Sequence, residues 1–408
     1  MSRTLLRNAR IFDGANDGLS EPKSILIEND RILQIDPSDS IEAVDHSVDL
    51  EGRTVMPGLI DAHFHAYASD VDFVKLEKLP PTYLAQRGRH LMEDALRRGF
   101  TTVRDVGGGD YGLWRALEEG WIQGPRLFYC GRAFSQSGGH GDIRSPSEDE
   151  SLCGCAGRGI LAERVDGVDA IRKAARESLR KGANHLKIFV SGGIASPSDP
   201  IWMLQFSEDE IAAVVDEARR RRVYVAAHAY TAETISRAVR LGVRTIEHGN
   251  LIDSAAAEDV AKAGAYVVPT LATYEAFRRS GVEDGVPQHL LDKLEEVASK
   301  GLDAIRLCRA AGVKLGFGTD LLGPMHKHQR DEFRLRGQAE TPFQVLNSAT
   351  AINAEILGME GQLGCVKPGA FADLLVVDGN PLEDLSVLHE DSTAIHSIWK
   401  AGKVVPLQ

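Results

Sequence analysis

The sequence has few cysteines, no long apolar run and no extended block of basic residues. Its 408 residues include 5 cysteines, an odd number without the spacing of a disulfide framework. No apolar run approaches the roughly 20 residues that a membrane helix needs. The first residues, Met-Ser-Arg-Thr-Leu-Leu-Arg, do not resemble a signal peptide. These absences predict a cytoplasmic protein that does not cross a membrane.

The charge balance excludes another class of partner. The sequence holds 47 Lys and Arg against 59 Asp and Glu, a net charge of −12, which argues against nucleic-acid binding. Its one basic block, Arg219–Arg222, closes a helical pattern, where cations suit the helix dipole. With 43% hydrophobic residues, the chain can bury a large core.

Short apolar runs alternate with helical patterns through the middle of the chain. Amphipathic spacing predicts helices over Tyr83–Arg98, Val168–Arg180, Glu208–Arg222 and Leu290–Ala311. Strand and helix in alternation favour a parallel sheet, and eight strands favour a (β/α)8 barrel. The runs expected as strands are Gly58–His65, Thr101–Val106, Arg126–Cys130, His185–Val190, Val223–His228, Thr245–His248, Ala265–Pro269 and Lys314–Thr319.

The two ends of the chain carry short strand patterns broken by Asp, Gly and Asn. We expect them to form one small β-sandwich domain from residues 1–57 and 358–408, beside a barrel domain over residues 58–357. The stretch Ala133–Val165 reads as a long irregular loop above the barrel mouth. The sequence patterns expected as terminal strands are Thr4–Ile11, Ser24–Glu28, Arg31–Ile35, Ser47–Leu50, Ala372–Val377 and His396–Trp399.

Metal-ligand residue types stand at the ends of several of these runs. His63 and His65 are two apart on a strand, so both side chains leave the same face. Catalytic residues of a barrel come from the carboxyl ends of different strands, and His228, His248 and Asp320 each end a run. Together these residues predict a metal centre at the barrel mouth.

Lys187 is the most informative position, because it lies inside the apolar run His185–Val190, where a buried ammonium is costly. A desolvated lysine with a lowered pKa can react with carbon dioxide to form a carbamate whose two oxygens bridge two cations.

Each of these residues also has an ordinary explanation when taken alone. The histidine pair could be polar alternation at a strand end, and Lys187 could extend to the barrel rim. His228 and His248 could be packed rim residues, and Asp320 could cap a helix. Only the combination favours a metal centre.

Six segments resemble the amidohydrolase superfamily, in order and over nearly the whole chain. Within it, the chain resembles the prolidase-like metal-dependent dipeptidases and carboxypeptidases, a group that also contains ochratoxin hydrolases. The matching segments are Pro57–His65, Lys187, His228, Glu247–Gly249, Gly318–Asp320 and Lys367–Leu374, and the narrower match adds Ser137–Gly141.

The resemblance implies two divalent metal ions. It assigns His63, His65 and Asp320 to one ion and His228 and His248 to the other, with carboxylated Lys187 and a hydroxide between them. Zinc is the default, although a mixed site of this kind also accepts manganese, cobalt or iron.

The implied reaction is hydrolysis of the amide bond of a dipeptide or N-acyl amino acid, with proline or another apolar residue at its C-terminus. We expect Asp320 to shuttle the proton, with His140 and Tyr230 as candidates for stabilising the oxyanion. His140 could instead be an ordinary loop residue, and Tyr230 could merely pack against a helix. Cyclic amides, lactones or phosphoesters are alternative substrates, and a non-catalytic scaffold is a further alternative.

The substrate's carboxylate needs a cation, for which Arg144, Arg158 and Lys327 are candidates beside backbone amides. His326 and His328 lie in a predicted loop after Asp320 and are expected to be solvated or to face the substrate. The resemblance also favours a homo-oligomer.

Overall fold

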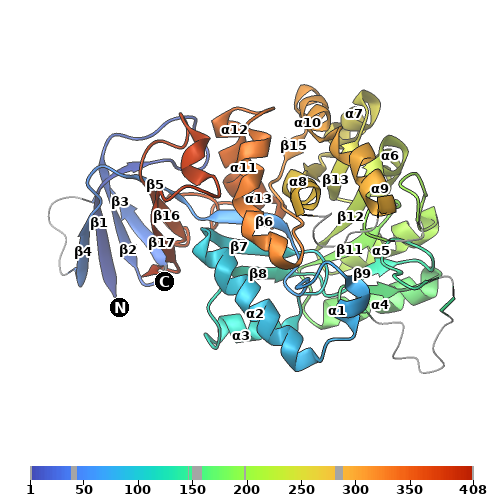
Figure 1. Cartoon of the computed structure of the whole chain (residues 1–408). Helices are drawn as coiled ribbons and strands as arrows, with labels where there is room; N and C mark the ends of the chain where they lie inside the picture. Colours follow the sequence, from blue (N-terminus) through green and yellow to red (C-terminus); the bar gives the residue numbers. More distant parts are fainter. Residues whose placement is uncertain are drawn as a thin grey trace.

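A computed structural model describes residues 2–37, 44–145, 147–148, 159–196, 199–280 and 288–406. Helices and strands alternate through its centre, and the two ends of the chain meet in a separate group of strands (Figure 1). The mixed α/β class predicted from the sequence is confirmed.

All eight apolar runs of the central region form strands. Their bounds differ from the runs by a few residues. Several strands are shorter because the run includes residues of the adjoining loops, whereas the strands that contain His228 and His248 continue to Thr231 and Leu251. The strands are β6 (Leu59–Phe64), β7 (Phe100–Asp105), β8 (Arg126–Tyr129), β11 (His185–Phe189), β12 (Tyr224–Thr231), β13 (Thr245–Leu251), β14 (Tyr266–Val268) and β15 (Lys314–Leu315).

These strands are parallel and belong to two hydrogen-bonded sheets. One sheet has the order β6-β7-β8, and the other runs from β11 through β12, β13 and β14 to β15, extended beyond β11 by β9 (Ala133–Ser135) and β10 (Ala162–Arg164). Backbone bonds also join the sheets at both edges: Ala62 N donates to Phe317 O at 2.8 Å, and Asn184 N donates to Tyr129 O at 2.8 Å. The carboxyl ends of the strands therefore meet on one side of the molecule.

Helices cover the outside of the strands (Figure 1). The amphipathic spacing explains this placement: α5 buries Ile211, Val214 and Ala218 against the sheet and begins with a capping box between Ser207 and Glu210. The helices around the strands are α1 (Phe73–Glu77), α2 (Pro81–Arg97), α3 (Tyr111–Glu118), α4 (Val168–Arg180), α5 (Glu208–Arg220), α6 (Ala232–Arg240), α7 (Ser254–Ala263), α8 (Leu271–Ser280), α9 (Gln288–Ala298), α10 (Gly301–Ala310), α11 (Asp331–Arg336), α12 (Pro342–Asn347) and α13 (Asn353–Ile356). Three further helical turns are η1 (Gly323–Arg330), η2 (Ser348–Ile352) and η3 (Leu385–Leu388).

Two sequence predictions about this region are corrected. The helix expected over Leu290–Ala311 is two helices, α9 and α10, because the chain turns at Ser299 and Lys300. Gly301 begins α10, and a Cβ atom there would stand 2.5 Å from Leu271 Cδ2, so a larger residue would require the leucine side chain to shift. The predicted irregular stretch over 133–165 contains β9 and β10 at its two ends. Its residues 146 and 149–158 lie outside the described part of the chain.

Strands from both ends of the chain pair with one another. β1 is shared between two groups: its first half pairs with β2 and β4, and its last residues, Arg10 and Ile11, pair with β5. β5 pairs in turn with β16, which follows the last helix. Figure 1 shows both termini in this group of strands. Its strands are β1 (Arg3–Ile11), β2 (Lys23–Glu28), β3 (Arg31–Ile35), β4 (His46–Asp49), β5 (Thr54–Pro57), β16 (Leu374–Val377), β17 (Ile395–Lys400) and β18 (Lys403–Val404).

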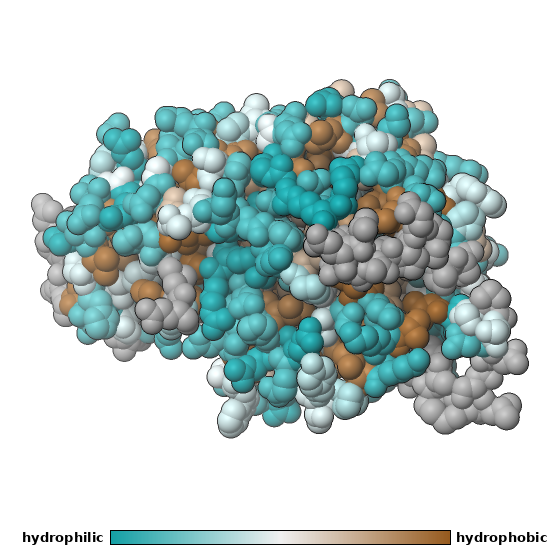
Figure 2. All heavy atoms as spheres, viewed as in Figure 1, coloured by the Kyte–Doolittle hydropathy of each residue, from teal (hydrophilic) through white to brown (hydrophobic). Residues whose placement is uncertain are grey.

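The surface seen in Figure 2 is largely hydrophilic, with scattered apolar atoms. Among the described residues, no helix is long and apolar enough to cross a bilayer. The three cysteines that the structure describes, Cys130, Cys308 and Cys365, are free thiols.

Candidate metal centre and active site

Three of the predicted ligands meet at one point, although they come from opposite ends of the central region. His63 and His65 stand at the carboxyl end of β6, and Asp320 follows β15. Asp320 Oδ1 lies 3.3 Å from His63 Nε2 and 3.2 Å from His65 Nε2. One ligand atom from each residue can therefore contact a single ion.

Hydrogen bonds set the orientation of both histidines. His63 Nδ1 lies 2.8 Å from Glu247 Oε2, and His65 Nδ1 lies 2.9 Å from Gly107 O. A carbonyl oxygen and an ionised carboxylate only accept hydrogen bonds, so Nδ1 is the donor in each ring and Nε2 presents its lone pair. Both lone pairs face the same Asp320 oxygen, an arrangement of acceptors that a divalent cation would satisfy.

The backbone around these ligands is held by Asp61, a buried residue of β6. Its carboxylate accepts hydrogen bonds from His63 N at 3.0 Å, Thr319 Oγ1 at 2.6 Å and Gln329 Nε2 at 2.8 Å. Asp320 itself has a φ of 53°, in the left-handed region that Asp tolerates better than most residues. Asp61 thus fixes the strand that carries the histidines to the loop that carries Asp320.

His228 on β12 and His248 on β13 stand beside this group, with ring centroids 4.7 Å apart. The His248 centroid is also 4.9 Å from that of His63. His228 Nε2 lies 3.2 Å from Gly192 O, which makes Nε2 the donor and leaves Nδ1 for a ligand. Burial lowers the pKa of His228 and of His248 well below the ordinary value, so both rings are neutral, as metal ligation requires.

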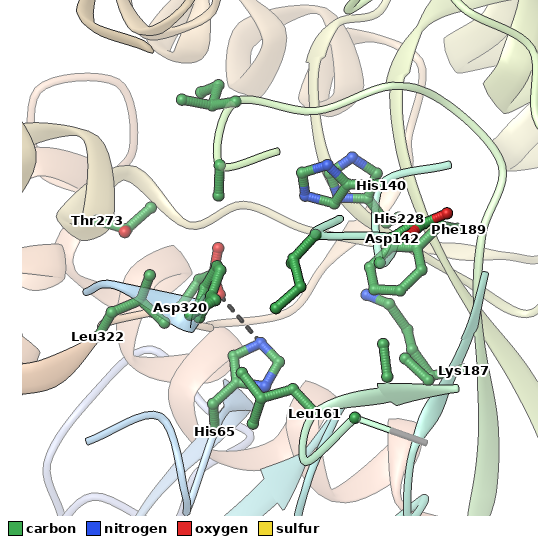
Figure 3. Close-up of a pocket in the computed structure, with 18 of the residues that line it drawn as sticks. His65, His140, Asp142, Leu161, Lys187, Phe189, His228, Thr273, Asp320 and Leu322 are labelled. Carbon is green, nitrogen blue, oxygen red and sulfur yellow. Dashed lines mark ion pairs between the residues drawn. The ribbon is translucent and has the colours of Figure 1, made fainter. Parts of the chain in front are cut away.

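Lys187 projects from the middle of β11 into the same space (Figure 3). Its residue is 2% exposed, and burial lowers the pKa of its ammonium to about 8, against the opposing effect of Glu247 and Asp320. Among the described residues, no hydrogen bond to Lys187 Nζ is formed, and the centroid of the Phe189 ring is 5.9 Å away. A buried amine in this state is suited to carboxylation.

Arg104 and Glu247 form a fully buried ion pair directly behind His63. Arg104 Nη2 donates to both carboxylate oxygens of Glu247 at 2.8 Å, and Arg104 Nη1 donates to Thr245 Oγ1 at 3.0 Å. Burial would raise the pKa of Glu247, but the Arg104 charge and the His63 hydrogen bond hold it well below the ordinary value. Glu247 is therefore ionised and accepts a hydrogen bond from His63 Nδ1.

The two residues predicted to stabilise an oxyanion also lie at the site. The His140 ring stacks on His228 with centroids 4.4 Å apart, and the Tyr230 ring stacks on His248 at 5.2 Å. Tyr230 Oη lies 3.2 Å from Tyr274 Oη. Burial raises the pKa of Tyr230 well above the ordinary value, so its hydroxyl keeps its proton and can donate.

These side chains form the base of a cavity of about 310 Å³. Figure 3 shows His65 and Asp320 on one side and Lys187, His140 and His228 on the other. The walls are mostly apolar, and Arg144 and Arg164 supply positive charge near Asp142. The apolar wall residues include Phe73, Ile143, Leu161, Phe189, Ile194, Phe277, Leu294 and Leu322.

The structure brings all six predicted ligands, His140 and Tyr230 to this one cavity. Of the cations predicted for a substrate carboxylate, Arg144 lines the cavity, Lys327 is exposed elsewhere, and Arg158 lies outside the described residues. The prediction for His326 is wrong: η1 buries its ring against Phe64 at 5.0 Å. His328 bonds to Glu390 at 2.7 Å instead of facing the substrate.

Sequence reasoning missed the residues that hold the ligands, namely Asp61, Arg104 and Glu247. A signal was present, because Arg104 and Glu247 are charges inside apolar strands, the same feature that singled out Lys187.

This chain is similar to known proteins over most of its length. The profile of the amidohydrolase family matches residues 54–405. Ochratoxinase from Aspergillus niger is 32% identical over 365 residues, which cover 86% of this chain and 75% of that protein.

Two solved structures extend the comparison to three dimensions. A prolidase complexed with N-methylphosphonate-L-proline has a TM-score of 0.96 and 44% identity, and the match covers 100% of both chains. A Xaa-Pro dipeptidase with bound methionine in its active site has a TM-score of 0.88 and 30% identity, over 99% of this chain and 100% of the other. The resemblance to prolidase-like amidohydrolases that the motifs indicated is confirmed.

Proposed function

Because this chain belongs to the amidohydrolase family, we propose that it is a binuclear metal-dependent hydrolase that cleaves the amide bond of dipeptides or N-acyl amino acids. One observation carries the proposal: a buried lysine, four histidines and an aspartate converge at the base of one apolar cavity. A scaffold protein would have no need for a buried lysine that finds no hydrogen-bond partner in the described part of the chain, because an isolated buried charge is costly.

The donor set fits two divalent ions. His63, His65 and Asp320 would hold one, and His228 and His248 would hold the other through the nitrogens that their hydrogen bonds leave available. Lys187, carboxylated by carbon dioxide, would supply an oxygen to each ion. When bound, such ions acidify water and polarise a carbonyl group. Zinc is the default metal for imidazole and carboxylate ligands.

Asp320 would transfer the proton during the reaction. Its carboxylate touches both histidines of the first group and lines the cavity, so it can take a proton from the attacking water and deliver it to the leaving nitrogen. Tyr230 keeps its phenolic proton and can donate a hydrogen bond to the oxygen on which negative charge develops. The His140 side chain lines the same cavity.

The cavity walls favour a substrate with an apolar residue, and we propose a C-terminal proline or another apolar amino acid. Two comparisons point the same way: one relative is a Xaa-Pro dipeptidase, and another is a prolidase with a proline-containing phosphonate bound. Arg144 is our candidate for binding the substrate's carboxylate, because guanidinium and carboxylate groups pair with good geometry.

The same proposal extends to the whole molecule. We interpret the parallel strands, joined at both edges by backbone bonds, as a (β/α)8 barrel over residues 58–357. The strands of residues 1–57 and 358–408 are then the second, β-sandwich domain. A cytoplasmic homo-oligomer remains our expectation for the working form.

The test is a hydrolysis screen of metal-loaded protein with bicarbonate, against Xaa-Pro and other dipeptides, N-acyl amino acids, cyclic amides, lactones and phosphoesters. We expect cleavage of the first two groups, lost in Lys187→Ala and Asp320→Asn. Cleavage confined to lactones, cyclic amides or phosphoesters would overturn the peptidase proposal. Absence of all cleavage in protein that holds two ions would favour a binding role.

A further inference from the structure

The loop that follows β11 leaves the strand and folds back onto its end. Gly192 N donates to Met203 O at 2.9 Å, and Gln205 N donates to Val190 O at 3.0 Å. Ser191 and Leu204 also form an isolated bridge. The described part of this loop is therefore a compact unit whose base is the strand that carries Lys187.

Asp199 is the centre of this loop and is fully buried. Its Oδ2 accepts hydrogen bonds from Gly193 N at 2.9 Å and Gln205 Nε2 at 3.0 Å, and it lies 3.2 Å from His140 Nδ1. Its Oδ1 has no hydrogen-bond partner among the described residues. Burying a carboxylate of which only one oxygen is hydrogen-bonded is costly.

His140 is held by this centre at two points. Its backbone N donates to Gln205 Oε1 at 2.9 Å, and its ring Nδ1 faces Asp199. The ring also lies flat on His228, with an interplanar angle of 15°. An ionised carboxylate only accepts hydrogen bonds, so Nδ1 is the donor and Nε2 is the nitrogen left for a substrate.

Gly193 makes this position of the ring possible. A Cβ atom on residue 193 would stand 2.1 Å from His140 Cε1, a distance at which the ring would have to move. The loop therefore packs its backbone directly against His140.

Lys293, on α9, fixes the loop from outside. Its ammonium donates to three backbone carbonyls of the loop: Gly193 O at 3.3 Å, Ser196 O at 3.0 Å and Asp199 O at 2.9 Å. Its three N–H donors are thus all used within one loop. Leu294, the next residue of α9, and Ile194 of the loop both line the cavity.

We propose that Asp199, held in place by Lys293, is a positioning residue that sets the His140 ring and presents its Nε2 to the substrate. This inference rests on the proposed function, and it adds a residue set that acts through His140. The same loop also supplies Gly192 O, 3.2 Å from Nε2 of the proposed ligand His228, so metal content is measured beside kcat. Ile194 lies in the loop that contains Asp199, and Leu294 follows Lys293 on α9. Because both line the cavity, a substrate's apolar group would pack beside the residues that hold His140.

The first experiment needs no substrate. Histidine labelled with ¹⁵N in the zinc-loaded protein reports which ring nitrogen carries the proton, and loss of a signal in His140→Gln assigns His140. We expect a protonated Nδ1 in the wild type and a shift toward protonated Nε2 in Asp199→Ala. A wild-type ring protonated only at Nε2, or an unchanged ring in Asp199→Ala, would overturn the proposal whatever the enzyme cleaves.

The second experiment is a double-mutant cycle on whichever substrate the screen identifies. We expect Asp199→Ala to lower kcat about 10- to 100-fold, the usual cost of losing an orienting partner, with metal content unchanged. In a His140→Gln background the same substitution should cause no further loss, since it acts through the absent ring. An equal loss in both backgrounds would show a merely structural role.

Two milder variants keep the test open if Asp199→Ala does not fold. Gly193→Ala displaces the ring directly, and Lys293→Met removes the ammonium while keeping the chain length. Both should lower kcat in the wild-type background and not in His140→Gln. Lys173→Met, an exposed lysine of α4, is the matched control and should leave kcat unchanged. Wild-type kinetics in both Gly193→Ala and Lys293→Met would contradict the proposal.

Discussion

Glu247 lies directly behind His63, with its Oε2 2.8 Å from His63 Nδ1. The same carboxylate accepts hydrogen bonds from Arg104 Nη2 on both oxygens, each at 2.8 Å. Both members of this ion pair are fully buried. The pair orients His63, which we propose as a metal ligand, from a distance of 184 residues along the chain, so it links the stability of the core to the geometry of the proposed site.

Glu247→Gln should therefore lower both the metal affinity of the proposed site and the stability of the protein. We expect metal affinity to fall about 10- to 100-fold, because the ligand loses its orienting carboxylate. The unfolding free energy of the metal-free protein should fall by about 3–5 kcal/mol, since Arg104 is left as an unpaired buried charge. Metal titration and urea unfolding measure the two effects. Arg104→Met combined with Glu247→Gln should recover part of the stability, and a double variant less stable than Glu247→Gln would contradict this account.

Lys187 should carry a carbamate in the metal-loaded protein. With a pKa of about 8, roughly a tenth of the lysine is neutral at pH 7, far more than for an ordinary lysine, and only the neutral amine attacks carbon dioxide. Protein loaded with metal in ¹³C-bicarbonate should show one carbamate resonance by ¹³C NMR. The resonance should be absent from Lys187→Ala and Lys187→Arg. Its absence from active wild-type protein would rule out the bridging role.

Glu332 on α11 gives a pH dependence of stability that is separate from the metal site. Burial raises the pKa of this carboxyl group to about 8 from an ordinary value of 4.5, and Arg336 only partly opposes the shift. The folded protein therefore keeps a proton that the unfolded chain releases above pH 4.5. This contribution is full below about pH 4.5 and is lost as the pH rises toward 8.

Glu332→Gln should remove the fall in stability between about pH 4.5 and pH 8. Glutamine is neutral at every pH and can still accept the hydrogen bond from Ala272 N. Relative to wild type, the variant should gain unfolding free energy between pH 5 and pH 8, on the order of a few kcal/mol. Urea unfolding of metal-free protein measures it. Glu296→Gln, at an exposed position of α9, is the control. A difference independent of pH would contradict the raised pKa.

Arg144 should act on substrate binding and not on the chemical step. Arg144→Met is expected to raise KM about 10- to 100-fold for substrates with a free carboxylate, the value of one hydrogen bond to a charged group, with little change in kcat. Dipeptide amides, which lack the carboxylate, should show no effect. Lys78→Met removes another cation that lines the cavity and is the matched control. A larger effect of Lys78→Met would move the carboxylate site to that residue.

The sequence predicted the strands and the residues at their ends, because His228, His248 and Asp320 each end an apolar run, and Lys187 stood out as a charge inside one. His228 and His248 could be placed on one side of the molecule from this rule alone. The turn at Ser299 and Lys300 that separates α9 from α10 was not predicted, since the amphipathic spacing continues across it. The pairing of Arg104 with Glu247, and of His140 with Asp199, also could not be predicted. Each residue can be seen in the sequence, but only the fold shows which residue it contacts. His326 has the spacing of a ligand pair with His328, and only the packing against Phe64 shows that it is a core residue.

The most direct test of the binuclear amide hydrolase is a titration of metal-free protein with zinc in bicarbonate buffer, with bound metal and cleavage of a Xaa-Pro dipeptide measured in the same samples. We predict that hydrolysis reaches its maximum at two ions per chain and that Asp320→Asn binds metal without regaining activity. Full activity at one ion per chain, or no cleavage with two ions bound, would contradict the central claim.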